Sequence, residues 1–202
     1  MKKIISLCLA LCMVCALSVS AFAAEIDTNG GTGSAPVNLS ATDDGTIGGD
    51  PSATAMSVTL PTALPMAMAQ NGDVTTADNC QIVNNSYGAV RIASVTITTA
   101  NGWKLTAFGD KTTLANEKVD SNKLGFALSV GNGTQTVTDN SDASSQRLIS
   151  APISGCYMSG VGNSAGNKVD VEYSAIVTPL SSPVTEATVA TVIFVVEWDT
   201  AA

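Results

Sequence analysis

The 202-residue sequence contains no histidine, so it lacks the commonest general base and the commonest metal ligand of proteins. Catalytic arrangements that pair serine or cysteine with histidine are therefore excluded. The cysteines that follow the N-terminal segment number only two, which is too few for a zinc site without histidine. Carboxylates could still act as a catalytic pair, but they fall mainly in predicted loops, where acids are ordinarily solvated. We expect a protein that is not an enzyme and that needs no cofactor.

Basic side chains are also scarce, with 9 lysines and arginines against 17 aspartates and glutamates. Two of the basic residues lie in the N-terminal segment, so the rest of the chain carries seven basic and seventeen acidic residues, a net charge of −10. Nucleic-acid binding requires a basic surface, so we expect no nucleic-acid partner. Aromatic residues make up only 4% of the chain, which leaves few to spare from a core.

Residues 1–23 are predicted to be a secretory signal peptide. Lys2 and Lys3 form a basic start, residues 4–19 are apolar, and Ala21-Phe22-Ala23 places small residues two apart before a cleavage site. A retained membrane anchor is the alternative, but the apolar run is short for a spanning helix, which needs about 20 residues. We therefore expect an extracellular or cell-surface protein with no membrane span after cleavage.

Three of the five cysteines, Cys8, Cys12 and Cys15, lie within this N-terminal segment. A lipid attached to one of them is a minor alternative, because none follows the small residues that lipidation requires. Cys80 and Cys156 remain after cleavage, and in an exported protein they could form a disulfide. The other interpretation is two separate buried thiols that act as small hydrophobic residues. Both interpretations stay open, because the sequence does not place the two Cα atoms within bridging distance.

Short runs of alternating apolar residues dominate the chain after a glycine-rich segment, residues 24–36, that we predict to be a flexible leader. Glycine, asparagine and proline separate the runs, and no helical period is sustained. The predicted strands are residues 37–41, 56–60, 64–68, 80–83, 90–100, 103–107, 124–130, 134–138, 147–153, 169–179 and 187–198. This pattern predicts an all-β fold, one antiparallel β-sandwich of about ten strands that spans residues 37–202.

The segment Val90–Leu105 is the densest in β-branched residues. We predict that it forms a hairpin of two strands joined by Asn101-Gly102, a dipeptide typical of turns whose central residues need positive φ. Its apolar residues change parity midway, which a regular strand cannot accommodate on one face. We therefore predict a β-bulge near Ala93-Ser94.

Three further elements are predicted from local patterns. Asn71-Gly72 favours a second hairpin turn, and residues 114–119 favour one turn of helix. The run 187–198 is apolar at both parities, which is typical of a strand that is covered on both faces. We expect this last strand to be central in its sheet or to be covered on both sides.

Two acidic loops and two tryptophans are the remaining candidate sites. Asp43, Asp44 and Asp50, and separately Asp139 and Asp142, could supply oxygen ligands to a structural calcium, although neither loop has the EF-hand spacing. Ordinary loop polarity is the alternative interpretation. Trp103 and Trp198 could be core aromatics or exposed platforms for a ligand.

The sequence Gly102-Trp103-Lys104-Leu105, which follows a strand rich in Val, Ile and Thr, resembles the first Trp-x-Leu motif of the WxL-domain surface proteins of Gram-positive bacteria. Trp198 falls where such domains carry their second motif, although Asp199 and Thr200 follow it here. Residues 56–198 are also similar to exported proteins of gut Firmicutes. This resemblance implies non-covalent attachment to peptidoglycan or to a surface protein.

Two functions follow from these observations as expectations. The first is a secreted or cell-surface, non-enzymatic β-sandwich that binds the cell wall or a surface partner protein. The alternative is a fibre-like or pilus-like structural subunit, a homo-oligomer in which the leader and residues 37–41 of one copy add to the sheet edge of a neighbour.

Overall fold

The computed structural model describes residues 55–139 and 142–200, and residues 54–202 form one compact unit. The predicted signal peptide (1–23), the predicted leader (24–36) and the predicted strand 37–41 lie outside the described residues. Within the described residues the fold is nearly all β, as the sequence predicts, with 3% helix and 42% strand. The antiparallel β-sandwich is therefore confirmed.

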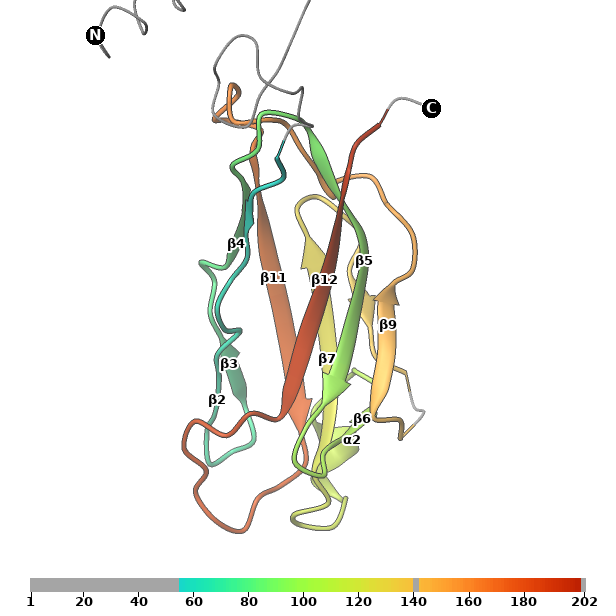
Figure 1. Ribbon diagram of the computed structural model, residues 1–202. Coiled ribbons are helices and arrows are strands. Elements are labelled where there is room, and N and C mark those ends of the chain that lie inside the picture. Colours follow the sequence, from blue (N-terminus) through green and yellow to red (C-terminus); the bar gives the residue numbers. More distant parts are fainter. Residues whose placement is uncertain (1–54, 140–141, 201–202) are drawn as a thin grey trace, which may run out of the picture. The chain divides into compact units, whose positions relative to one another are not determined.

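Twelve strands and one short helix make up the described part of the chain (Figure 1). Their bounds are β1 Val58–Thr59, β2 Met66–Met68, β3 Val74–Thr76, β4 Gln81–Asn84, β5 Val90–Thr99, β6 Lys104–Thr106, α2 Thr112–Ala115, β7 Lys123–Val130, β8 Thr136–Val137, β9 Ser145–Ile149, β10 Tyr157–Met158, β11 Lys168–Val177 and β12 Ala190–Trp198.

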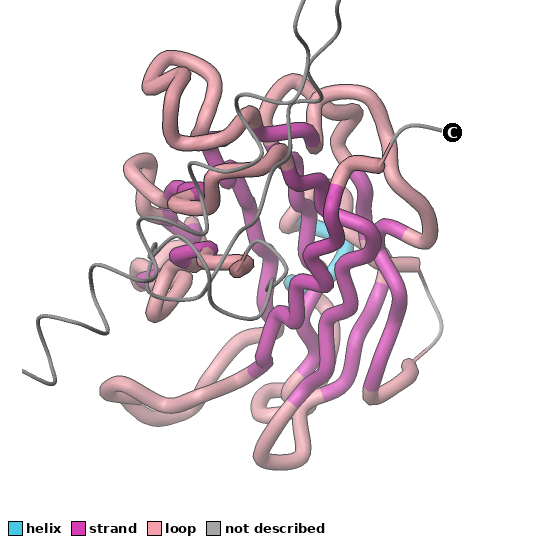
Figure 2. The backbone as a smooth tube through the Cα atoms, turned by 45° about the horizontal axis from the view of Figure 1, so that its top comes forward, coloured by secondary structure: helices cyan, strands magenta, loops and turns pink. Residues whose placement is uncertain are grey.

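The strands form two main sheets and one hairpin (Figures 1 and 2). The larger sheet has the order β1-β4-β11-β7-β6, and β8 also pairs with β7. The smaller sheet has the order β10-β5-β12, and β9 also pairs with β5. The hairpin consists of β2 and β3. All the strand pairs are antiparallel except β6 with β7, which is parallel.

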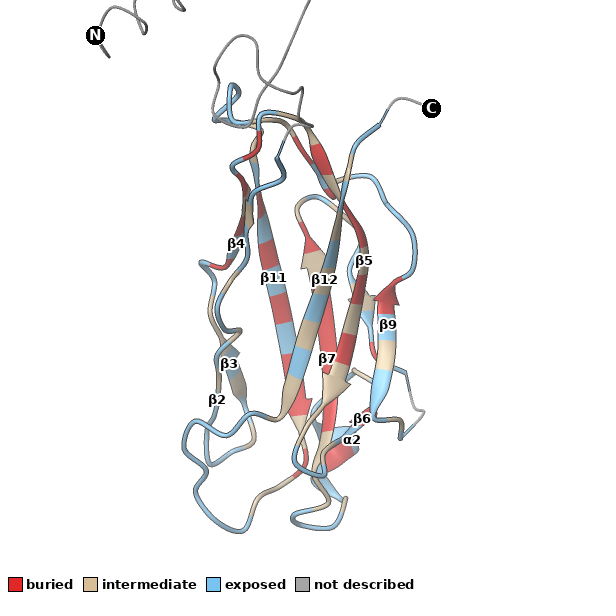
Figure 3. Ribbon diagram, viewed as in Figure 1, coloured by how far each residue is buried: buried red, intermediate tan, exposed pale blue. Residues whose placement is uncertain are grey.

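One hydrophobic core lies between the two sheets, built from the inward side chains of β4, β5, β7, β9 and β11 (Figure 3). Tyr173 of β11 stacks on Phe126 of β7, with 5.9 Å between the ring centroids. The Tyr173 hydroxyl donates to the Pro65 carbonyl at 2.6 Å and accepts from the Ala77 N–H at 3.2 Å. Burial raises the pKa of this phenol, so the hydroxyl stays protonated and can donate. The side chain thus ties the β2–β3 hairpin to the core.

The predicted hairpin of Val90–Leu105 is wrong in its pairing, although its turn is correct. Asn101 and Gly102 both have positive φ, at 52° and 80°, as this turn dipeptide favours. However, β6 pairs with β7 in the other sheet instead of returning along β5. The reason is that both edges of β5 are occupied, one by β12 and the other by β9 and β10.

The predicted bulge near Ala93-Ser94 is confirmed. Ser94 lies opposite Val195 and Ile92 lies opposite Val196, so Ala93 is an extra residue on β5. The side chains of Ile92, Ala93 and Val95 are all buried, because the extra residue changes the parity of the strand. The bulge therefore keeps both apolar halves of β5 on the core face.

The smaller local predictions are mostly correct. Asn71-Gly72 does turn the β2–β3 hairpin, with Gly72 at a φ of 79°. The predicted helical turn at 114–119 occurs slightly earlier, at Thr112–Ala115. It begins there because the Asp110 carboxylate accepts from both the N–H and the hydroxyl of Thr112, at 2.8 Å each. These two bonds lower the pKa of Asp110.

Candidate functional site

The strand β12 is the feature of the described chain that most needs a functional explanation. The prediction of a strand that is central or covered on both sides is wrong, because among the described residues β12 pairs only with β5 and its outer face is exposed. Its side chains alternate between half-buried and exposed, and Ile193 and Val195 on the outer face are 51% and 44% exposed. β12 is apolar at both parities because its outer face also carries apolar side chains, and no described segment covers that face.

The ladder between β5 and β12 decides which backbone groups face the free edge of β12. The Ala100 N–H donates to the Val189 carbonyl at 2.8 Å, so by alternation residues 191, 193 and 195 direct their N–H and C=O groups to β5. The Asp199 N–H donates to the Ala89 carbonyl at 3.0 Å, and the alternation resumes from there beyond the bulge. The even-numbered residues 190–198 therefore direct their backbone groups away from β5.

This free edge carries none of the usual devices that keep edge strands from pairing. Residues 190–196 include no charge and no proline. The charges lie at one end, where Arg91 contacts Glu197 and Asp199 at 3.6 Å each. The bulge lies in β5 and leaves the free edge of β12 regular. A nine-residue edge of this kind is a template for another strand.

The two flanks of the sandwich are closed to different extents. On one flank β9 contacts β6 and β8 of the larger sheet, and the Leu105 N–H donates to the Ala143 carbonyl at 2.8 Å. β12 lies on the other flank, because it pairs with the edge of β5 opposite β9. On that flank the apolar side chains of β1, β2, β3 and β12 are only partly buried, as Figure 3 shows for β12. These residues are Val58, Met66, Val74, Val192, Phe194, Val196 and Trp198.

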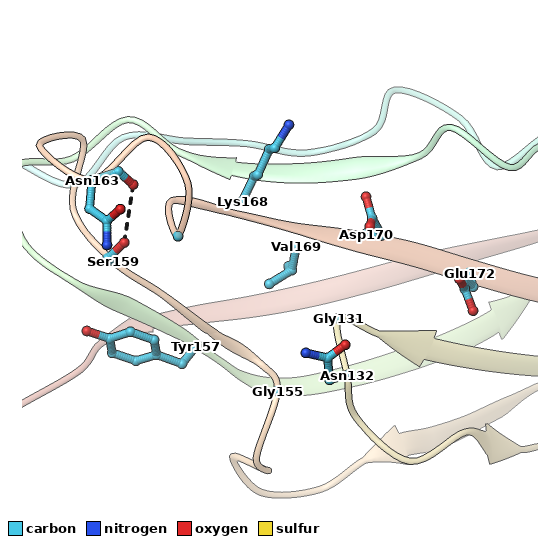
Figure 4. Close-up of a pocket in the computed structure, with 11 residues that line it drawn as sticks. Gly131, Asn132, Gly155, Tyr157, Ser159, Asn163, Lys168, Val169, Asp170 and Glu172 are labelled. Carbon is cyan, nitrogen blue, oxygen red and sulfur yellow. Dashed lines mark hydrogen bonds between the residues drawn. The ribbon is translucent and has the colours of Figure 1, made fainter.

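A second candidate site is a polar hollow of about 560 Å³ between β11 and the segment 155–159 (Figure 4). Its floor is a crossing of two loops that only glycine permits. A Cβ on Gly131 would collide with the Gly155 carbonyl oxygen, and one on Gly155 would lie 2.5 Å from the Gly133 nitrogen. Gly131 and Gly155 also have positive φ, at 55° and 93°, which favours glycine.

The side chains around this hollow are polar, with one exposed ring. Figure 4 shows Lys168 and Asp170 on one side of the gap and Tyr157 on the other, and Tyr157 is 51% exposed. The Asp170 carboxylate accepts from the Gln81 side-chain amide at 2.7 Å. The other polar residues that line the hollow are Asn132, Ser159, Asn163 and Glu172. Hydrogen-bonding groups beside an exposed aromatic ring can hold a polar ligand such as a sugar, although no nucleophile here is paired with a base.

Of the described residues singled out from the sequence, Trp198 belongs to the first candidate site as the last residue of β12, and the others line neither site. In the structure Cys80 and Cys156 are both buried free thiols that belong to the core. Burial raises the pKa of Cys156, which makes this thiol unreactive. Leu105 is fully buried, and both tryptophans are partly buried against the core.

The two tryptophans lie at opposite ends of β5. Trp103 follows the turn after the last residue of β5, and its backbone N–H donates to the Ala100 carbonyl at 3.0 Å. Trp198 pairs with Val90, the first residue of β5. A ten-residue strand separates the two ends by about 30 Å, so the tryptophans cannot form one binding surface.

The calcium hypothesis gains no support from the described residues. Asp43, Asp44 and Asp50 lie outside them, and Asp139 and Asp142 flank two residues that are also outside them. Within residues 55–139 and 142–200, no group of three or more His, Cys, Asp or Glu side chains is placed to hold a metal ion. The same residues include no helix that is long and apolar enough to cross a membrane.

Sequence reasoning missed both candidate sites. The signal for the hollow is the glycine pair in Gly131-Asn132-Gly133 together with Gly155, although glycines between strands ordinarily indicate only turns. The signal for the edge was the lack of charge over residues 190–196, which indicates a strand with little protection against pairing. Comparison with known proteins adds nothing further, because no family model, curated protein or solved structure matches this chain.

Proposed function

We propose that the protein is an exported, non-enzymatic β-sandwich that associates with a partner protein at the cell surface by accepting a strand at the free edge of β12. The observation that carries this proposal is the unpaired nine-residue edge with Ile193 and Val195 exposed on its outer face. Such an edge supplies backbone hydrogen bonds for affinity and side-chain positions for specificity. The partner is another protein or, in a fibre, another copy of this chain.

Sedimentation velocity of the chain without residues 1–23, over a range of concentrations, tests this proposal. Ile193→Lys places a charge on the outer face of the edge and should abolish association without unfolding the protein. Val137→Lys is the matched control, because Val137 is 45% exposed but lies in β8, which contacts β9 on the flank opposite β12. The proposal would be contradicted if both variants still associate. It would also be contradicted if the parent protein neither self-associates nor binds a partner protein.

A second proposed function is binding of the cell wall, and the polar hollow beside Tyr157 is the observation that favours it. Sugar rings stack on exposed aromatic rings while their hydroxyls bond to amides and carboxylates. Tyr157→Ala should therefore reduce co-sedimentation with purified peptidoglycan. Tyr87→Ala is the control, since Tyr87 is 85% exposed but does not line the hollow. Equal pelleting of the parent protein with and without peptidoglycan would remove this function.

A further inference from the structure

The free edge of β12 specifies what kind of strand can pair with it. A strand added there lies over the open flank, where the apolar side chains of β12, β1, β2 and β3 are only partly buried. It therefore needs apolar residues at alternate positions to extend the core. Its other face lies beside Ile193 and Val195 and is exposed, so polar residues are acceptable there.

One segment of the chain outside the described residues has this pattern. Between residues 24 and 54, only Val37-Asn38-Leu39-Ser40-Ala41 has apolar residues at three alternate positions, and it carries no charge. We propose that residues 37–41 of one copy pair with the free edge of β12 of a neighbouring copy, with Val37, Leu39 and Ala41 facing the core. This inference rests on the proposed function and names the partner strand.

The parity of β12 fixes the face on which each residue of the added strand lies. Residues that lie directly opposite each other in a ladder point to the same face of the sheet. Val192 and Phe194 point to the core and direct their backbone groups to the free edge, so Leu39 lies opposite one of the core-facing residues. Asn38 and Ser40 then lie on the outer face, beside Ile193 or Val195.

The direction of an antiparallel added strand, and not the length of residues 42–54, favours a neighbour over the same copy. The described chain begins beside the end of β12 that carries Trp198, because the Ser57 N–H donates to the Ser86 hydroxyl at 2.8 Å and Trp198 packs on Gly88. A segment inserted antiparallel to its own β12 would run away from this end, and residues 42–54 would have to turn back along the sheet. A neighbour's segment needs no reversal, and thirteen residues span up to about 45 Å.

Each copy would then donate one segment and accept one, which builds either an open chain of subunits or a closed assembly, depending on the rotation between neighbours. The arrangement is heterologous, because the donor segment and the acceptor edge are different surfaces of the same protein. The leader of 24–36 precedes the donor segment, so it stays outside the paired region.

Disulfide trapping between two separately purified variants tests the inference, with both chains lacking only residues 1–23. One variant carries Ser40→Cys and the other carries Ile193→Cys or Val195→Cys, and a bond between them is necessarily intermolecular. We expect a cross-linked pair on a non-reducing gel, in at least ~tenfold higher yield than with Leu39→Cys as donor, because a core-facing side chain points away from the acceptor thiol. The native thiols of Cys80 and Cys156 are buried, and the parent protein gives the background level of cross-linking that they cause.

The outcomes separate this inference from the proposed function. Equal yields for Ser40→Cys and Leu39→Cys, or no cross-link with either acceptor, would overturn the inference. A disulfide that forms only within a single chain carrying both Ser40→Cys and Ile193→Cys would also overturn it. If Ile193→Lys still abolishes association in those cases, the edge is used by a different strand and the proposed function stands. If Ile193→Lys has no effect on association, both fail.

Discussion

Apart from β5, the two longest strands are β11 and β12. The sequence of each suggests the position in a sheet that the other occupies. β11 alternates apolar residues with Asp170, Glu172 and Ser174, a pattern typical of a strand with one face in water. Nevertheless β11 is central in its sheet, paired with β4 and β7. β12 is apolar at both parities, yet it is an edge strand.

The comparison shows that the burial of a strand's faces and the pairing of its edges are separate properties. Side-chain alternation reports which faces of a strand are buried, whereas pairing depends on which strands the topology brings alongside. In β11 both the faces and the edges are satisfied, because its polar face is solvated and both of its edges are paired. In β12 an apolar face is exposed and one edge is unpaired among the described residues, so the strand is incomplete by both measures.

The largest difference between the two strands should appear in stability. Tyr173→Ala in β11 removes a buried ring, its stacking on Phe126 and its bond to the Pro65 carbonyl, and should cost about 4 kcal/mol of unfolding free energy. Ile193→Ala in β12 should change the unfolding free energy by less than ~0.5 kcal/mol. Urea unfolding of both variants measures this, and comparable losses would contradict the comparison.

The next largest effect concerns Asn84, at the end of the strand that pairs with β11. Its side-chain amide donates to the carbonyls of Gly88 and Ser159 at 2.9 Å each and accepts from the Ser86 N–H at 2.9 Å. Asn84→Ala leaves these buried groups unpaired and should cost about 2–3 kcal/mol in urea unfolding. The neighbouring Asn85→Ala is the control, because Asn85 is exposed and its variant should unfold like the parent.

A pair of prolines tests which backbone groups of β12 face outward. The N–H of Ile193 is directed to β5, whereas the N–H of Val192 is directed to the free edge. Ile193→Pro should therefore unfold more easily than Val192→Pro by about 1 kcal/mol, the value of one ladder hydrogen bond. Thermal unfolding of the two variants gives the comparison, and the reverse order would show that the assigned parity of the edge is wrong.

A feature of this fold can be predicted from the sequence only where the contacts that determine it are local. The bulge at Ala93 could be predicted, because the change of parity is written in consecutive residues of one strand. The turn at Asn101-Gly102 was also predictable, but its pairing was not, since that depended on β12 and β9 occupying the edges of β5. The free edge of β12 and the loop crossing at Gly131 have local signals in the sequence, but these signals do not show which segments the topology brings alongside.

The smallest expected effect concerns the loop that leads into β12. The Asp120 carboxylate accepts from the hydroxyl and the N–H of Ser181, at 2.5 and 2.9 Å, and these bonds lower its pKa below the ordinary 3.8. Its stabilising contribution is present above the pKa of the unfolded chain and is lost as the pH falls through the lower folded pKa. Asp120→Asn should slightly reduce the unfolding midpoint at pH 6 and make little difference at pH 2. An equal loss at both pH values would contradict this.

The central claim is that the free edge of β12 accepts a strand, and amide hydrogen exchange of the chain without residues 1–23 tests it most directly. In dilute protein the amides of residues 192, 194 and 196 should exchange quickly, while those of 191, 193 and 195 are protected by β5. On assembly the first set should become protected as well. Assembly that leaves residues 192, 194 and 196 in fast exchange would contradict the claim.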